Sequence, residues 1–265
     1  MLKNFQENIV IEGLRQTLFD GKLLFFESID STNDLAKRMW LEGAGSGTVV
    51  FAEQQTVGRG RMGRQWVSPA SSNLLLSILL RPLVAADEVF VLTMLLALAG
   101  IEAVKEISNV SALIKWPNDI YVDGKKLCGI LTEFSVRGRG LEYVILGLGI
   151  NVNWNPENDE SILYPATSLM KETGHRVSRE LLLVTLLMTF ESYYLELLKE
   201  GSDKFYKIWN KRSMLLGKRV SVDTPEGMIN GIAERIDKKG ALIVVTGKGR
   251  EQRVMSGDVS VQNIE

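Results

Sequence analysis

The sequence predicts an α+β protein that ends in a separate, small all-β domain. Over residues 1–216, apolar strand-like runs alternate with segments of helical periodicity, a mixture typical of the α+β class. From Lys218 onward, short strand-like runs are separated by turn residues at Asp223–Gly227 and Lys238–Gly240. The chain has 265 residues, which suits one large domain and one small one. We therefore expect domains at residues 1–216 and 217–265, the second with the size of a small SH3-like β-barrel.

Strand and helix patterns follow one another through the first half of the chain. The side chains of Asp30–Asn33 favour a helix N-cap, and Asp87 gives a later helix the acidic start that suits the helix dipole. The expected elements are, in order, a strand at 22–27, a helix at 32–42, strands at 48–53 and 73–80, and a helix at 87–106.

The second half of the large domain continues the same mixture. The pair Asp123–Gly124 is a strong hairpin signal, and Ser178 suits the start of a long helix. The expected elements are strands at 113–116, 120–122, 126–134 and 141–152, followed by helices at 178–200 and 203–211.

Composition and charge exclude several classes of protein. With 31 basic and 32 acidic residues the formal net charge is −1, so no global field attracts nucleic acid and any anion site must be local. The single cysteine, Cys128, excludes an intramolecular disulfide and a multi-thiolate zinc site, and the single histidine disfavours a Ser-His-Asp mechanism. The first residues have no signal-peptide core, and the longest apolar stretch, Val89–Ile101, is too short to cross a membrane. We expect a cytoplasmic protein with no membrane partner.

The segment Gly58–Trp66, with the sequence GRGRMGRQW, is the most unusual in the chain. Its first seven residues contain three arginines and three glycines, and no acidic residue lies between Gln54 and Pro82. Glycines let the backbone approach a ligand, and arginine forks match phosphate oxygens, so we predict an anion-binding loop. Two alternatives stay open: a solvated loop without a ligand, and a dinucleotide-binding turn, although the latter requires a helix where a strand is expected. Trp66 suits either a cover over the site or plain packing.

Two lysine-containing segments meet around one predicted hairpin. Lys115–Asp119 has the sequence KWPND, and Pro117 bars a regular strand there, so Asn118 and Asp119 are expected on a bend that faces a site. The second segment, Lys125–Leu131, has the sequence KKLCGIL. Strict alternation would place Lys126, Cys128 and Ile130 on one face and Leu127, Gly129 and Leu131 on the other. The alternative is an exposed hairpin with ordinary surface lysines.

A third segment, Gly147–Asn153, ends an apolar strand with the sequence GLGINVN. Glycines at positions i and i+2 clear one face of a strand for a flat ligand, and Asn151 adds a polar group at the rim. Tight packing of the sheet explains the same pattern equally well.

Taken in order, these segments resemble those of the biotin protein ligases. Ser31-Thr32-Asn33, GRGRMGRQW, KWPND, KKLCGIL and GLGINVN have that family's order and approximate spacing, and the combination is highly specific. The resemblance, which extends from about Lys22 to the end, implies a catalytic domain like that of class II aminoacyl-tRNA synthetases followed by an SH3-like barrel. It also implies that biotin and ATP form biotinyl-5′-AMP and pyrophosphate, with Mg²⁺, before biotin is transferred to a lysine of a biotin carboxyl carrier protein.

The resemblance also implies roles for individual residues. Biotin-binding residues are expected to be Ser31, Thr32, Gln55, Gly58, Arg59, Arg61, Lys126, Gly129, Leu131, Gly147 and Gly149. Residues binding ATP or the adenylate are expected to be Arg59, Arg61, Arg64, Trp66, Lys115, Asn118, Lys126 and Asn151, with magnesium near Asn151. Lys126 and Arg61 would neutralise the two reacting anions, and Asp119 would assist the acceptor lysine. Met62 stands where many relatives have another arginine, which puts retention of the adenylate in question.

Three further expectations concern partners. Some relatives carry a DNA-binding domain, but about twenty residues precede the first expected strand, too few for such a module, so no repressor role is expected. Homodimers occur in the family and are an option here. The rival functions are a lipoate ligase with the same fold and a nucleic-acid-binding module that uses the arginine loop and the barrel.

Overall fold

A seven-stranded mixed sheet forms the centre of the protein. The computed structural model describes residue 2 and residues 4–138, 140–162, 164–247 and 249–262. In the sheet, β1 and β2 are parallel and all other neighbours are antiparallel, in the order β1-β2-β3-β7-β6-β5-β4. The strands are β1 (Leu23–Phe26), β2 (Thr48–Ala52), β3 (Leu74–Leu80), β4 (Leu113–Lys115), β5 (Asp119–Val122), β6 (Lys125–Arg137) and β7 (Gly140–Ile150).

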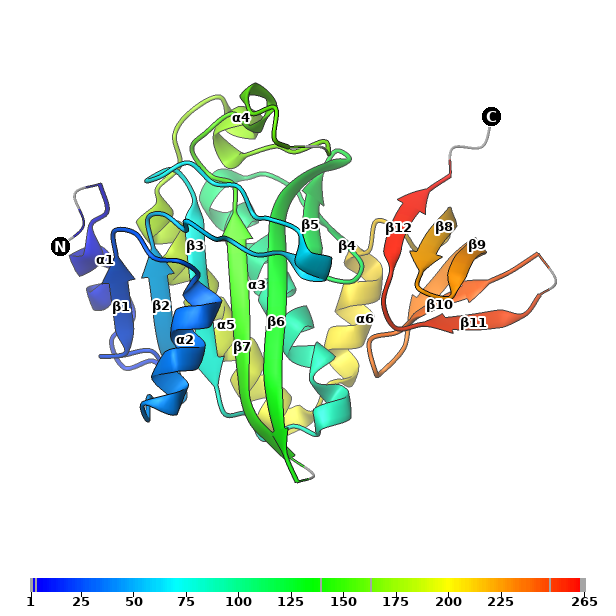
Figure 1. The fold of residues 1–265 in the computed structure, drawn as a ribbon, viewed down its shortest axis with the longest axis horizontal. Coiled ribbons are helices and arrows are strands. Elements are labelled where there is room, and N and C mark those ends of the chain that lie inside the picture. Colours follow the sequence, from blue (N-terminus) through cyan, green and yellow to red (C-terminus); the bar gives the residue numbers. More distant parts are fainter. Residues whose placement is uncertain (1, 3, 139, 163, 248, 263–265) are drawn as a thin grey trace.

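Helices cover both faces of this sheet (Figure 1). Helix α2 (Thr32–Leu41) lies on one face against β2, β3 and β7, and α3 (Phe90–Ser108) lies on the other against β5, β6 and β7. Because β7 is covered on both sides, its residues from Val144 to Ile150 are all buried. The remaining helices are α1 (Glu7–Gly13), α4 (Leu169–Thr173), α5 (Arg179–Glu200) and α6 (Asp203–Arg212).

Helix α5 has the length and hydropathy of a membrane-spanning helix. However, one of its faces, which includes Leu183, Leu187 and Phe190, is fully buried, and the helix packs against α3 and α1. A buried face of this kind is typical of a core helix.

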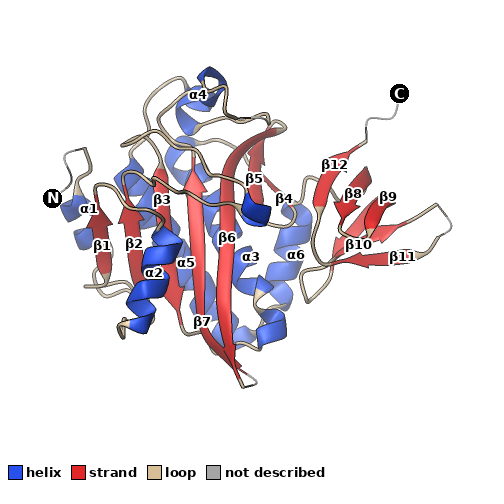
Figure 2. Cartoon of the chain, viewed as in Figure 1, coloured by secondary structure: helices blue, strands red, loops and turns tan. Residues whose placement is uncertain are grey.

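The C-terminal part of the chain forms a second sheet made only of antiparallel strands (Figure 2). Its order is β11-β10-β9-β8-β12, with β8 (Arg219–Thr224), β9 (Gly227–Ile236), β10 (Leu242–Val245), β11 (Glu251–Val254) and β12 (Asp258–Val261). The predicted α+β class is therefore confirmed, including the change to short strands after residue 217.

A tight turn of the second sheet packs against the first domain. The turn joins β9 to β10, and a methyl group added at Gly240 would lie 2.2 Å from Phe90 Cγ, so the backbone approaches α3 closely. Trp116, next to β4, donates a hydrogen bond from Nε1 to the Gly240 carbonyl at 2.8 Å. A hydrogen bond from the KWPND segment thus connects the first domain to the second sheet.

The hairpin between β5 and β6 forms at Asp123–Gly124, as predicted, with positive φ at both residues. The predicted alternation along the second strand is wrong, because β6 contains a β-bulge. Tyr121 pairs with Lys126, whereas the residue before it pairs with Cys128, so Leu127 is an extra residue. Lys126 therefore lies on the same side as Gly129: its Nζ would be 3.4 Å from a methyl group added at Gly129.

Candidate active site

One cavity of about 240 Å³ lies between the large sheet, the Gly58–Trp66 loop and the start of β12. Its volume is close to the lower end of the range typical of small-ligand sites. All but two of the predicted site residues line it: Ser31, Thr32, Gln55, Arg59, Arg61, Arg64, Trp66, Lys115, Asn118, Asp119, Lys126, Gly129, Leu131, Gly147 and Gly149. The structure thus brings Arg61 and Lys126 into one cavity.

Glycines of two neighbouring strands form the floor of the cavity. Gly129 of β6 pairs with Gly149 of β7, and Leu131 pairs with Gly147, so two strands lack side chains at adjacent positions. The indole of Trp66 lies directly on this floor, since a methyl group added at Gly149 would be 2.5 Å from Trp66 Cε2. At Gly147 a methyl group would lie 2.2 Å from Asn33 Oδ1, so side chains of this protein pack on the glycines at both positions. The close packing that the sequence analysis left open is therefore observed, and space for a flat ligand stays a prediction.

Lys126 is held above this floor by one carboxylate and two aromatic rings. Its Nζ lies 2.8 Å from Asp119 Oδ2, and both side chains are less than one-fifth exposed. The same Nζ lies 5.7 Å from the ring centroid of Trp66 and 5.4 Å from that of Tyr164. The other carboxylate oxygen, Asp119 Oδ1, is buried and has no hydrogen-bond partner in the described part of the chain.

Two further cations lie on the side of the cavity formed by the KWPND turn. Arg61 donates to Asn118 Oδ1 at 3.1 Å and to Ser256 Oγ, which belongs to the second domain, at 3.0 Å. Burial lowers the pKa of Arg61 and also that of Lys115, while the nearby Asp119 carboxylate raises both. The cavity therefore collects positive charge at a partly desolvated place.

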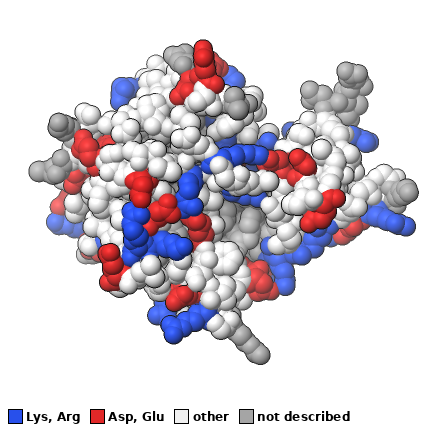
Figure 3. Space-filling model, in the orientation of Figure 1, with Lys and Arg blue, Asp and Glu red and all other residues white. Residues whose placement is uncertain are grey.

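The other two loop arginines pair with acidic residues of different elements. Arg59 lies 2.5 Å from Asp34 Oδ1 and 3.2 Å from Glu133 Oε2, and Arg64 forms an ion pair with Asp258 of β12. Basic and acidic side chains accordingly lie side by side across the middle of this face (Figure 3). The loop is held at both ends, which argues against the alternative of a freely solvated loop.

Met62, which lies between these arginines, has a left-handed backbone with φ 55° and is 63% exposed. It therefore adds neither charge nor packing to the cavity.

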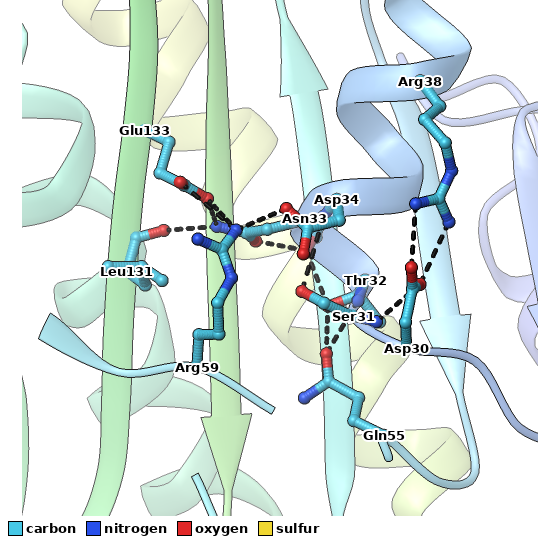
Figure 4. A network of polar contacts seen from close by, with 11 residues as sticks. Asp30, Ser31, Thr32, Asn33, Asp34, Arg38, Gln55, Arg59, Leu131 and Glu133 are labelled. Carbon is cyan, nitrogen blue, oxygen red and sulfur yellow. Dashed lines mark hydrogen bonds and ion pairs between the residues drawn. The ribbon is translucent and has the colours of Figure 1, made fainter. Parts of the chain in front are cut away.

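A network of polar contacts forms the end of the cavity beside α2 (Figure 4). Ser31 caps the helix by accepting a hydrogen bond from the Asp34 backbone, as the sequence predicts. Gln55 Oε1 accepts from both the backbone nitrogen and the hydroxyl of Thr32, at 2.7 and 2.9 Å. The buried hydroxyl of Ser77 lies 2.7 Å from the Thr32 hydroxyl, a contact that the sequence analysis missed.

Two predicted residues lie outside the lining of the cavity. Gly58 forms the base of the loop, where its carbonyl accepts a hydrogen bond from the Trp66 backbone at 2.9 Å. Asn151 is buried behind the floor, and its side-chain amide donates to the Thr167 carbonyl at 3.0 Å. Its predicted place beside phosphate and magnesium stays a prediction.

The sequence analysis also missed part of the wall. Gly257, Asp258 and Val259, at the start of β12, line the cavity although no motif marked them. Tyr164, which lies between β7 and α4, lines it too, and its ring centroid is 5.4 Å from Lys126 Nζ. Among the described residues no group of three or more His, Cys, Asp and Glu side chains could hold a metal ion.

Comparison with known proteins gives matches along most of the chain. Residues 25–151 match the Biotin/lipoate A/B protein ligase family, and residues 215–262 match the Biotin protein ligase C terminal domain. The bifunctional ligase/repressor BirA of Bacillus subtilis is 32% identical over 250 residues, covering 94% of this chain and 77% of that protein. The biotin–[acetyl-CoA-carboxylase] ligase of Paracoccus denitrificans is 35% identical over 226 residues, covering 84% of this chain and 93% of that protein.

Solved structures with the same fold include complexes with small molecules. The biotin protein ligase from Aquifex aeolicus in complex with biotin and ATP has a TM-score of 0.78 at 30% identity, covering 92% of this chain and 100% of that one. The biotin protein ligase from Leishmania major in complex with biotinyl-5-AMP has a TM-score of 0.57 at 25% identity, covering 89% and 99% of the two chains.

Proposed function

Since the chain belongs to the biotin protein ligases, we propose that it joins biotin to ATP and then transfers biotin to a lysine of a biotin carboxyl carrier protein. One observation carries the proposal: Arg61 and Lys126 converge on one cavity whose floor is formed by the glycines of β6 and β7. Such a cavity can hold a flat, mostly apolar ring system on the glycines and two acidic groups beside the cations. The solved complex of the Aquifex aeolicus relative with biotin and ATP supports this pairing of ligands.

In the first step, the carboxylate of biotin attacks the α-phosphorus of ATP and pyrophosphate leaves. Both reactants are anions, so they repel each other until positive groups lie at their oxygens. Lys126 is the first choice for that role, because Asp119 and two aromatic rings already fix its position. Arg61 is the second, since its guanidinium is partly desolvated and held by Asn118 and Ser256.

The product of this step is a mixed anhydride that water hydrolyses. The Gly58–Trp66 loop lines the cavity and its indole lies on the floor, a position from which it would shield the anhydride from water. In the second step, the amine of the acceptor lysine must lose a proton as it attacks the carbonyl carbon and AMP leaves. Asp119 Oδ1, which is buried and without a partner in the described chain, is available to accept that proton.

A magnesium ion would enter with ATP. Because no cluster of acidic side chains occurs among the described residues, we propose that phosphate oxygens and water supply most of its ligands. Asn151 Oδ1 fits as one protein ligand by its chemistry, since it is a buried side-chain oxygen without a hydrogen-bond partner among the described residues. When bound, the ion would neutralise charge on the phosphates.

The decisive experiment compares two adjacent lysines. Wild-type protein incubated with biotin, ATP and a carrier domain should release pyrophosphate and biotinylate the carrier lysine. Lys126→Gln should lower kcat for pyrophosphate release by about 10²–10³-fold, the usual loss for one preorganised donor. Lys125→Gln is the matched control, because Lys125 is 40% exposed, pairs with Glu157 and does not line the cavity; it should stay within about twofold of wild type.

Three outcomes would overturn the proposal: no pyrophosphate from wild-type protein, equal activity of Lys126→Gln and wild type, or a preference for lipoate over biotin. The third outcome would favour the rival lipoate ligase.

We also propose that the chain does not bind DNA. The net charge is −1, and two of the loop arginines pair with Asp34, Glu133 and Asp258 of the same chain. A gel shift with salt-dependent affinity would contradict this proposal.

The site of action is proposed to be the cytoplasm, which the buried free thiol of Cys128 supports, since unpaired cysteines suit a reducing compartment. Homodimerisation stays a prediction, which sedimentation of the purified protein checks.

A further inference from the structure

Glu133, on β6, connects the arginine loop to the polar end of the cavity without lining the cavity itself. Its two carboxylate oxygens lie 3.3 and 3.2 Å from Arg59 Nη2. The Oε2 oxygen also accepts a hydrogen bond from Asn33 Nδ2 at 2.6 Å. One carboxylate therefore joins the loop to the first turn of α2 (Figure 4).

Asn33 continues this connection into the site. Its side chain is buried, and its Nδ2 also donates to the Leu131 carbonyl at 3.3 Å. Its Oδ1 lies 2.6 Å from the Ser77 hydroxyl, which is 2.7 Å from the Thr32 hydroxyl. Thr32 lines the cavity, so an unbroken series of polar contacts runs from the cavity to Arg59.

The hydroxyl groups in this series are sensitive to a ligand. Three contacts in this series join two oxygen atoms and so require a hydroxyl proton: Thr32 with Gln55, Ser77 with Thr32, and Ser77 with Asn33. Thr32 and Ser77 supply only two such protons, so one of the three contacts has none. A ligand group that hydrogen-bonds to Thr32 changes whether the Ser77 hydroxyl donates to Thr32 or to Asn33. The choice alters how firmly Asn33, and through it Glu133, is held.

We propose that Glu133 is a positioning residue that couples closure of the arginine loop to occupation of the cavity end beside Thr32 and Gln55. The inference deepens the proposed function and rests on it, since the ligand at that end would be the ring of biotin. The Arg59–Glu133 ion pair is more than one-third exposed on both sides and by itself contributes little. The shared carboxylate matters because buried Asn33 fixes its orientation, so Arg59 meets a preorganised partner.

The test uses Glu133→Gln, which leaves an amide oxygen to accept from Asn33 but removes the charge that faces Arg59. Glu102→Gln is the matched control: Glu102 is also 37% exposed and pairs with one arginine, Arg212, at 3.1 Å, and neither of the two lines the cavity. Pyrophosphate release gives kcat and KM for each substrate. Limited trypsin digestion, which cuts after the loop arginines, reports the closure of the loop.

Glu133→Gln should raise the KM for biotin by about threefold to tenfold, the range expected for one charge-assisted contact that is partly exposed. The KM for ATP and kcat should change less than about twofold, on the same scale. Trypsin should cut the loop faster than in wild type by a similar factor, and Glu102→Gln should match wild type in every measurement.

Equal biotin KM and equal loop cleavage in Glu133→Gln and wild type would overturn the inference. If Glu133→Gln does not fold, Arg59→Gln gives a second test, because it leaves Asn33 and Glu133 in contact. It also removes the ion pair between Arg59 and Asp34, so trypsin should cut after Arg61 and Arg64 at least as fast as expected for Glu133→Gln. In the folded case, Glu133→Gln should add no further effect in an Arg59→Gln background. If wild-type protein releases no pyrophosphate, the proposed function is overturned instead. Trypsin digestion without ligand then still tests the contact between Arg59 and Glu133.

Discussion

Replacing Gly149 by alanine tests whether the indole of Trp66 occupies the floor of the cavity. The added methyl group would lie 2.5, 2.7 and 2.8 Å from Trp66 Cε2, Cζ2 and Nε1. Carbon atoms at van der Waals contact are about 3.5–4.0 Å apart, so the indole must move by about 1 Å. Since Trp66 is on a loop, we expect it to move outward while β7 stays in place.

The magnitude follows from two opposing effects. Inserting a methyl group into a packed site costs about 1–3 kcal/mol, and replacing glycine by alanine in extended backbone returns about 0.4–1 kcal/mol through the unfolded state. A net loss of about 1–2 kcal/mol corresponds to a melting temperature lower by about 2–6 °C. The methyl group also takes space from a flat ligand, so the KM for biotin should rise by about tenfold.

Calorimetry and pyrophosphate release measure the two effects. Gly140→Ala is the matched control, because Gly140 is on the same strand and a methyl group there would meet nothing within 4 Å; it should leave both values unchanged. In a Trp66→Ala background the stability loss of Gly149→Ala should disappear. If Gly149→Ala destabilises the protein equally with and without the indole, the contact with Trp66 is not the cause and the reasoning fails.

Three further substitutions and one labelling experiment have defined expected outcomes. Asp258→Asn removes the partner of a loop arginine, so trypsin should cut the loop about threefold faster and the KM for ATP should rise; unchanged cleavage would count against a role for β12. Met62→Arg adds a positive charge at an exposed position of the loop, so release of the adenylate in a filter-binding assay should slow by about threefold to tenfold; equal release from the variant and wild type would refute this prediction. Arg38 donates hydrogen bonds to Asp30 and lowers its pKa to about 2, from about 3.9 in the unfolded chain. Asp30→Asn should therefore lower the free energy of unfolding by about 0.2–1 kcal/mol above about pH 4, a small value because the ion pair is exposed. The difference from wild type should vanish as the pH falls towards 2, which denaturant titrations at several pH values would measure. Burial raises the pKa of the Cys128 thiol, so thiol reagents should label it only after unfolding, and rapid labelling of native protein would contradict its buried position.

Much of the fold followed from local patterns in the sequence. Each predicted strand and helix of the large domain overlaps an observed one, because apolar periodicity, caps and turn residues act within a few positions of the chain. Helices α1 and α4 were missed, since they have only seven and five residues. The side on which Lys126 lies was predicted wrongly, because a bulge depends on the pairing with β5 and leaves no mark in the strand's own residues.

The site was predictable where its residues lie in motifs and unpredictable where they meet across domains. The motifs around Arg61 and Lys126 led to the cavity, but nothing near Ser256 or Asp258 in the sequence marks them as partners of a loop almost two hundred residues earlier. The same holds for Ser77, a polar residue within an apolar strand whose role depends on α2. Such contacts arise from topology, which local patterns do not encode.

The loop arginines have one consequence for which anions the site admits. Arg59 and Arg64 already form ion pairs with carboxylates of their own chain. An entering anion must displace one of these carboxylates, which stays close to the arginine because it belongs to the same protein. A small free anion, such as inorganic phosphate, can replace one competitor at a time and faces immediate return of the carboxylate. A triphosphate that reaches several cations at once overcomes this competition. On the proposed function, these ion pairs would therefore favour ATP over simple anions at the loop arginines.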